Sequence, residues 1–174
     1  MLLSTDPDIA SDLLELFNYL SGFSKQKHYQ KLLVSPSTLR EKFIFLINRE
    51  IQHAEQGVTA EIIAKMNSLV DPEIINLLYS ASQKGVKIKL IIRGICCLYP
   101  QRKNLSENIK VISIIGHFLE HSRIFWFYNN GDNEVFIGSA DWMRRNLDRR
   151  IEAVTPIEDY ELKSKIYSLL QTYI

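Results

Sequence analysis

Short apolar runs that alternate with amphipathic segments strongly limit how residues 32–92 can fold. The run at 32–34 leads into an amphipathic segment that ends at Gly57, and the run at 60–66 leads into another that ends near Gly85. A third apolar run, 86–92, follows directly. Strand, helix, strand, helix and strand at this spacing are typical of an α/β sheet with parallel crossovers. We therefore expect the early part of the sheet to be parallel.

Local signals mark where the helices begin and end. Asp6 and Asp71 each precede a proline and an amphipathic segment, which predicts two capped helices. The first of these helices is expected to end at Gly22. Ser37 or Thr38 is the expected cap of the helix between the first two strands.

The second half of the chain has a different pattern. Residues 109–115, 123–128, 134–138 and 151–155 form short β-rich segments, followed by Pro156 and a closing amphipathic helix. Asn130-Gly131, between two of these segments, is a good hairpin signal. The sequence therefore predicts an α/β fold whose mixed β-sheet is flanked by helices, in a single domain over residues 1–174.

Composition excludes several classes of protein. With 174 residues and 46% hydrophobic residues, the chain can bury a real core, and its net charge of +1 argues against nonspecific nucleic-acid binding. No apolar run is long enough for a transmembrane helix, and the N-terminus lacks the basic region of a secretory signal. Cys96 and Cys97 are the only cysteines, which indicates a reduced, cytoplasmic protein in which both are small buried hydrophobes.

Polar or glycine-marked groups follow four of the predicted strands, where open α/β sheets bind ligands. They are Lys65 to Asn67, Arg93-Gly94, Glu120 to Arg123, and Gly138 to Asp141. Lysine and arginine supply positive charge, serine and asparagine supply hydrogen bonds, and glycine allows close backbone approach. These groups together indicate phosphate binding.

His121 is the best catalytic candidate among the four histidines. It is expected to start a strand with Arg123 two residues later and on the same face, and imidazole beside guanidinium suits phosphoryl chemistry. The structural alternative is a histidine bonded to a carbonyl group at a strand edge. His28, His53 and His117 have weaker claims, and the four histidines show no metal-ligand spacing.

Arginines at 144, 145, 149 and 150 form the densest positive cluster. Such a run is either a solvated basic face or, because it follows the strand end at Gly138, a further phosphate contact. The chain contains neither a P-loop nor a dinucleotide-binding glycine fingerprint.

Long motifs in the chain resemble a known family. The segments AKMNSLVDPEII, ASQKGVKIKLIIRGICCL, LSENIKVISIIGHFLEHSRIF and IGSADWMRRNLDRRIEAVTPIED are similar to the C-terminal part of bacterial polyphosphate kinases of the phospholipase-D-like type. The resemblance extends over nearly the whole chain, and it corresponds to the second of two related C-terminal domains in a much longer enzyme.

The resemblance implies a function and several site residues. The family transfers the terminal phosphate of ATP reversibly to inorganic polyphosphate, through a phosphohistidine and with Mg²⁺. The phosphorylated histidine and the Mg²⁺ ligands are expected outside this chain, so the chain alone is expected to be inactive. Arg93 and His121 match ATP-binding positions and are expected at adjacent strand ends. Strand-end position adds weaker candidates for ATP or phosphate binding: Arg123, Lys65, Asn67, Ser139, Asp141 and Arg144.

The broader phospholipase D pattern is only partly kept. Arg123 replaces its lysine, Tyr128 stands at its aspartate position, and Asp141 replaces its asparagine. Two alternatives stay open: a phosphodiesterase formed by homodimerisation, and a non-catalytic polyphosphate-binding module that uses the 144–150 arginines. The expected partners are ATP or ADP, polyphosphate and the remaining domains of the same enzyme. Homo-oligomerisation and membrane association of the full-length enzyme are left open.

Overall fold

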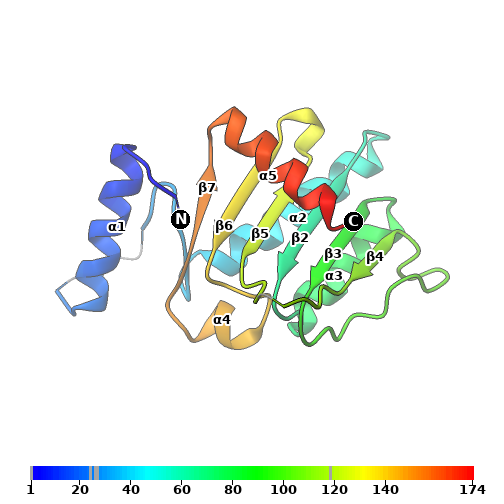
Figure 1. The fold of residues 1–174 in the computed structure, drawn as a ribbon, viewed down its shortest axis with the longest axis horizontal. Helices are drawn as coiled ribbons and strands as arrows, with labels where there is room; N and C mark the ends of the chain where they lie inside the picture. Colours follow the sequence, from blue (N-terminus) through cyan, green and yellow to red (C-terminus); the bar gives the residue numbers. More distant parts are fainter. Residues whose placement is uncertain (1, 24, 26–27, 118) are drawn as a thin grey trace.

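Seven strands form one mixed sheet in the computed structural model, which describes residues 2–23, 25, 28–117 and 119–174. Their order across the sheet is β1-β7-β6-β5-β2-β3-β4 (Figure 1). Three strands are parallel: β2 (Glu61–Met66), β3 (Lys87–Ile92) and β4 (Ile109–Ile112). The antiparallel part comprises β5 (Arg123–Phe127), β6 (Glu134–Gly138), β7 (Glu152–Ile157) and β1 (Leu33–Ser35). The mixed sheet predicted from the sequence is confirmed.

The position of β1 differs from the expectation of an entirely parallel early half. Leu33–Ser35 pairs antiparallel with β7, at the edge of the sheet opposite β4. The alternation of strands and helices is correct, but it does not specify which strands become neighbours. The parallel portion therefore starts at β2 rather than at β1.

Helices cover both faces of the sheet (Figure 1). α2 (Leu39–Glu55), α3 (Pro72–Gln83) and the short α4 (Arg144–Asp148) contribute to the larger core, in which Phe43, Phe125 and Trp142 pack ring to ring. α5 (Tyr160–Thr172) covers the other face, where Tyr167 packs on Trp126. α1 (Pro7–Leu20) lies beside β1 and contributes Leu16 to a third, smaller cluster.

Two of the three predicted helix caps are confirmed. Asp6 accepts hydrogen bonds from the backbone N–H groups of Asp8 and Ile9, and Asp71 accepts one from Ile74 at 3.0 Å. Thr38 does occupy the N-cap position of α2, but its side chain makes no cap bond. Its hydroxyl instead accepts a hydrogen bond from the N–H of Val34.

The structure confirms one predicted turn and corrects two predicted strand boundaries. The predicted hairpin joins β5 to β6 through a turn at Asn129–Gly131, in which Asn130 and Gly131 have positive φ. β4 ends at Ile112, three residues before the predicted end. Pro156 lies inside β7 rather than after it, because β1 pairs only with residues up to Val154 and the rest of β7 is an edge that tolerates proline.

The two cysteines differ in exposure. Cys96 is half-buried and packs against the larger core, whereas Cys97 is exposed, so the prediction of two buried cysteines is wrong for Cys97. Both are free thiols. Of the helices in the described part of the chain, none has the length and apolar character needed to cross a membrane.

Arg40 joins three helices through ion pairs. Its guanidinium donates to both carboxylate oxygens of Asp71, at 3.1 and 2.7 Å, to both of Asp148, at 2.6 and 2.9 Å, and to Glu73 at 2.6 Å. Burial alone would raise the pKa of Asp71, but the bond from Arg40 and the N–H of Ile74 outweigh it and lower the pKa. This cluster therefore ties α2 to α3 and α4.

Candidate functional site

The four polar groups predicted at strand ends meet at one edge of the sheet (Figure 1, lower edge). β2 and β3 are parallel, so their C-terminal ends lie side by side. β5 is antiparallel to β2, and β6 is antiparallel to β5, so the start of β5 and the end of β6 lie at the same edge. This topology brings the 65–67, 93–94, 120–123 and 138–141 groups together, as the sequence predicted.

Leu69 links three of the loops at this edge. Its N–H donates to the carbonyl of Ile95 at 2.9 Å, and its carbonyl accepts from Cys97 at 2.9 Å. The next residues, Val70 and Asp71, both donate to the carbonyl of Trp142 at 3.0 Å. Because Leu69 is fully buried, this backbone pairing holds the three loops in a fixed arrangement.

Asp141 organises the centre of the site. It accepts hydrogen bonds from the backbone N–H of Asn67 at 2.9 Å and from its side-chain amide at 3.2 Å. The guanidinium of Arg123 pairs with the same carboxylate at 3.1 Å. Both side chains are largely buried, so Asp141 fixes the orientation of Arg123.

His121 lies at the exposed rim beside Arg123. β5 begins at Arg123, so the prediction that His121 starts the strand is wrong, and the same-face argument does not apply. Arg123 nevertheless reaches back: its Nη1 donates to the carbonyl of His121 at 2.9 Å and lies 3.0 Å from the ring nitrogen Nδ1. The same Nη1 lies 3.3 Å from the other ring nitrogen, Nε2, so the guanidinium is close to both imidazole nitrogens.

Arg93 lies two strands from His121 rather than at an adjacent strand end, because β2 separates β3 from β5. At a strand spacing of about 4.8 Å, this places the two backbones roughly 10 Å apart. Gly94 donates to the carbonyl of Asn67 at 2.7 Å, and a Cβ at Gly94 would lie 3.0 Å from that oxygen. Glycine at this position therefore allows the loop that carries Arg93 to pack closely against the end of β2.

Lys65 is buried, with its side chain only 3% exposed. Its ammonium group donates to the hydroxyl of Ser122 at 2.8 Å and pairs with Glu120 at 3.1 Å. Tyr173 completes the group, since its hydroxyl donates to the same Glu120 oxygen at 3.3 Å. Sequence reasoning missed the role of Tyr173, because no local pattern links the end of α5 to the start of β5.

Ser139 and Asp141 both follow the end of β6, but they bond to different partners. The hydroxyl of Ser139 donates to the carboxylate of Glu152, which also accepts from the side-chain amide of Asn146. Glu152 is buried on β7, and the sequence analysis did not single it out. Its only signal was a charged residue at the start of a predicted strand.

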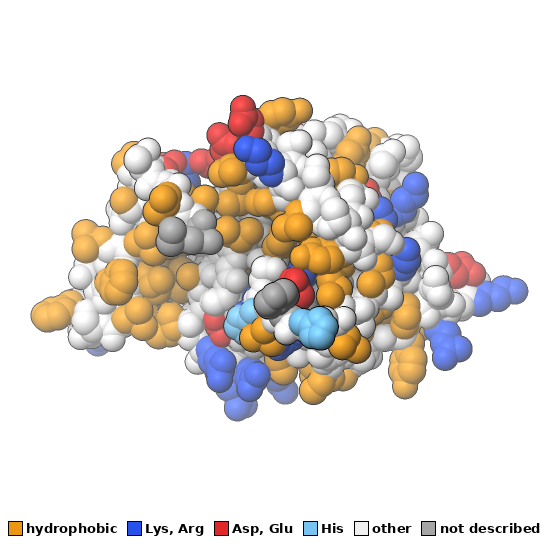
Figure 2. Space-filling model, in the orientation of Figure 1, with side chains coloured by type: hydrophobic (Ala, Val, Ile, Leu, Met, Phe, Trp, Pro, Cys, Tyr) orange, Lys and Arg blue, Asp and Glu red, His pale blue; other side chains and the backbone are white. Residues whose placement is uncertain are grey.

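Arg144 is not drawn into this cluster. Its side chain is 79% exposed, and its ion pair is a long one of 3.9 Å with Asp148, in the next turn of the same helix. The neighbouring arginines at 145, 149 and 150 are exposed as well. Figure 2 shows a group of basic side chains at the lower border of the molecule, close to a histidine.

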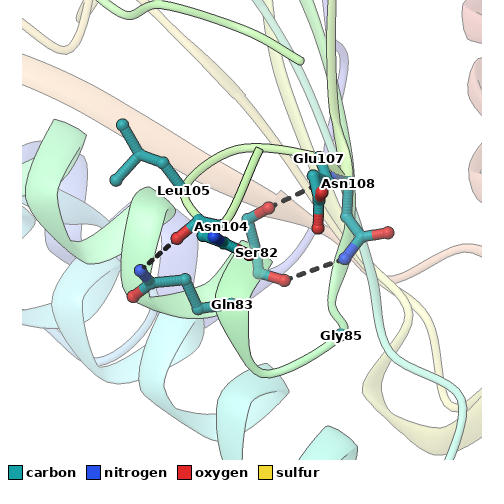
Figure 3. Close-up of a pocket in the computed structure, with 7 residues that line it drawn as sticks. All are labelled: Ser82, Gln83, Gly85, Asn104, Leu105, Glu107 and Asn108. Atoms are coloured by element: carbon teal, nitrogen blue, oxygen red, sulfur yellow. Dashed lines mark hydrogen bonds between the residues drawn. The ribbon is translucent and has the colours of Figure 1, made fainter. Parts of the chain in front are cut away.

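Two hollows differ in their distance from this cluster. A polar one, about 360 Å³, lies at the opposite edge of the sheet, and its side chains bond to neighbours within it (Figure 3). There the amide of Asn108 donates to the carbonyl of Ser82, and Gln83 donates to the carbonyl of Asn104. A larger, mainly apolar trough of about 730 Å³ runs between α1 and α5 and reaches Arg123 at one end. Figure 2 shows hydrophobic side chains gathered over this face of the sheet.

The site offers cationic and neutral donors rather than metal ligands. Within the described ranges, no group of three or more His, Cys, Asp or Glu residues lies close enough to hold a metal ion. The acidic residues at this edge, Asp141 and Glu120, already accept from Arg123 and Lys65. The arginine and histidine side chains at this edge are groups that can bind phosphate oxygens.

Comparisons with known proteins identify the family of the chain. The family model described as "Polyphosphate kinase C-terminal domain 2" matches residues 32–174. A polyphosphate kinase from Prochlorococcus marinus is 64% identical over 99% of the chain, which covers 24% of that protein. The chain therefore spans about a quarter of the length of this curated relative.

Solved structures show the same fold. The crystal structure of a polyphosphate kinase from Porphyromonas gingivalis aligns with 97% of the chain at 43% identity and a TM-score of 0.94, and the chain covers 26% of it. The phospholipase D family member Nuc from Salmonella typhimurium aligns with 82% of the chain and 91% of its own, at 16% identity and a TM-score of 0.55. At that identity, the match with Nuc shows a phospholipase-D-like fold and nothing more.

Proposed function

The chain belongs to the polyphosphate kinase family, and on that premise we propose that it supplies nucleotide and phosphate contacts to the enzyme. The proposed reaction is the reversible transfer of the terminal phosphate of ATP to inorganic polyphosphate. In this proposal Arg93 binds the phosphates of ATP, and His121 contacts the phosphate in transfer. Arg123 holds the imidazole and adds positive charge beside it.

The paired side chains of His121 and Arg123 carry this proposal. They lie at the rim of the sheet edge, 3.0 Å apart, with Arg93 two strands away. A phosphoryl group in transfer spreads negative charge over its equatorial oxygens, so positioning and charge neutralisation account for most of its catalysis. In this proposal the imidazole of His121 also acts as a general acid that donates a proton to the leaving oxygen.

The remaining part of the enzyme is the proposed partner of this chain. The mainly apolar trough between α1 and α5 ends at Arg123, beside the proposed site. We propose that the preceding domain of the same polypeptide covers the trough and supplies the phosphorylated histidine. The chain alone is then expected to be inactive. The proposal also leaves the Mg²⁺ ligands outside the chain, and no step is assigned to the metal.

Kinetics of variants in a full-length polyphosphate kinase that carries this chain as its C-terminal domain 2 test the proposal. His121→Ala should lower kcat by about 10²- to 10⁴-fold, the range expected for loss of a positioned acid–base group. Arg93→Ala should mainly raise KM for ATP. His28→Ala and Arg102→Ala are matched controls, since both residues are exposed and lie outside the sheet edge. Wild-type activity in His121→Ala would overturn the proposal.

A second candidate function rests on the exposed arginines of α4. If polyphosphate retention is the main role of the chain, reversing the charge at positions 144, 145, 149 and 150 should abolish polyphosphate binding, whereas His121→Ala should leave it intact. A dimeric phosphodiesterase is the third outcome, recognised by hydrolysis of a model phosphodiester that His121→Ala abolishes.

A further inference from the structure

The short segment that carries His121 leads into β5. Among its described residues, 113–117 and 119–122 lie outside any helix or strand, and both His121 and Ser122 are exposed. The β5 ladder begins only at Arg123. The orientation of the imidazole therefore depends on side chains that reach the segment from elsewhere in the fold.

Lys65 bonds to both residues that flank His121 in the sequence. Its ammonium lies 2.8 Å from the hydroxyl of Ser122 and 3.1 Å from the carboxylate of Glu120. The aromatic ring of Tyr173 has its centroid 5.4 Å from the same ammonium. A buried ammonium is costly unless it is fully partnered, and these three groups partner it.

The C-terminal end of α5 also contacts the segment, through Glu120. The hydroxyl of Tyr173 donates to Glu120, and burial, followed by the nearby Glu120 carboxylate, raises the pKa of this phenol, so it keeps its proton. The position of Tyr173 is itself fixed, since Leu170 is fully buried and Lys110 of β4 donates to the carbonyl of Ile174 at 3.0 Å. Glu120 is thus held between a strand of the central sheet and the last turn of a helix.

We propose that Lys65 is a positioning residue, which with Glu120 and Tyr173 holds the 119–122 segment so that His121 faces its substrate. A phosphate could reach the Lys65 ammonium only by displacing Ser122 and Glu120, because the side chain is 3% exposed. Lys65 therefore acts through His121 and does not bind phosphate directly. The inference deepens the proposed function and rests on it where His121 is concerned.

NMR on the isolated chain tests the positioning directly. Lys65→Met should lower the heteronuclear NOE of residues 119–122 and shift the ring resonances of His121. Lys65→Arg, which can still donate to Ser122 and Glu120, should restore both. Lys89→Met is the matched control, since Lys89 lies on β3 and forms its ion pair with Glu61. If Lys65→Met unfolds the chain, Tyr173→Phe, which removes one hydroxyl, should produce a smaller change in the same direction.

Kinetics in the full-length enzyme complete the test. Lys65→Met should lower kcat about 10- to 100-fold while KM for ATP changes less than about 3-fold, since positioning a group affects the chemical step more than substrate binding. The double variant with His121→Ala should be no slower than His121→Ala alone. Unchanged NMR signals in both Lys65→Met and Tyr173→Phe would overturn the inference. If those signals change while His121→Ala is fully active, the positioning stands and the proposed function fails.

Discussion

Arg40 and Arg123 have similar burial and different surroundings. Arg40 is surrounded by three carboxylates, from Asp71, Glu73 and Asp148. Arg123 pairs with one carboxylate, Asp141, and directs a second nitrogen towards His121. Their side chains are 20% and 13% exposed, so burial does not distinguish the two clusters.

The two guanidinium groups differ in how many of their N–H donors bond to other residues of the fold. Arg40 bonds to three carboxylates, two at the start of α3 and one on α4, and has no free direction for a ligand, which is typical of a structural ion-pair network. The Arg123 cluster has fewer anions, and it reaches an exposed imidazole at the rim of the sheet. Number of partners and access, rather than charge or burial, therefore distinguish Arg40 from Arg123, the arginine of the proposed site.

Removing Arg40 should have the largest effect on stability. Arg40→Met leaves Asp71, which is nearly fully buried, facing two further carboxylates without a cation. Breaking a buried pair in this way costs about 3–5 kcal/mol in the free energy of unfolding. Urea denaturation of the isolated chain measures it. A loss below about 1 kcal/mol would show that the network contributes little to the fold.

Removing Arg123 should lower activity strongly and stability only moderately, unlike the removal of Arg40. In Arg123→Met, Asp141 keeps two donors from Asn67, so we expect a smaller stability loss of about 1–3 kcal/mol. In the full-length enzyme, kcat should fall about 10²- to 10³-fold, because an electrostatic donor at the transferred phosphate is lost. Urea denaturation and steady-state kinetics give the two values. Equal behaviour of Arg40→Met and Arg123→Met in both assays would contradict the comparison.

Acid should weaken the Arg40 cluster gradually. The pKa of Asp71 is lowered in the folded chain from its ordinary value of 3.8, so the unfolded state binds more protons between the two values. The stability contributed by Asp71 is therefore complete above about pH 4 and is lost as pH falls through the folded pKa. Unfolding free energies measured at a series of acid pH values should show this decline. Asp71→Asn should reduce it, and an unchanged slope would mean that other carboxylates dominate.

Local patterns in the sequence predicted much of the molecule. Asp71 before Pro72 marked the start of α3, the Asn130-Gly131 pair marked the β5–β6 hairpin, and the polar strand ends marked the site. These features succeed because capping, turn geometry and strand period depend on residues close together in the chain. The sequence did not predict that β1 pairs antiparallel with β7. This pairing depends on contacts between residues more than one hundred positions apart in the chain.

The sequence by itself determined the element types, two of the three predicted caps and, through family motifs, the identity of Arg93 and His121 as candidate residues. Only the tertiary structure showed that Lys65 binds Glu120 and Tyr173, that Asp141 orients Arg123, and that β2 separates Arg93 from His121. The physical reason is the distance along the chain over which each effect acts, since propensity and periodicity depend on only a few neighbouring residues. A buried ion pair instead joins side chains whose proximity exists only after the sheet has formed.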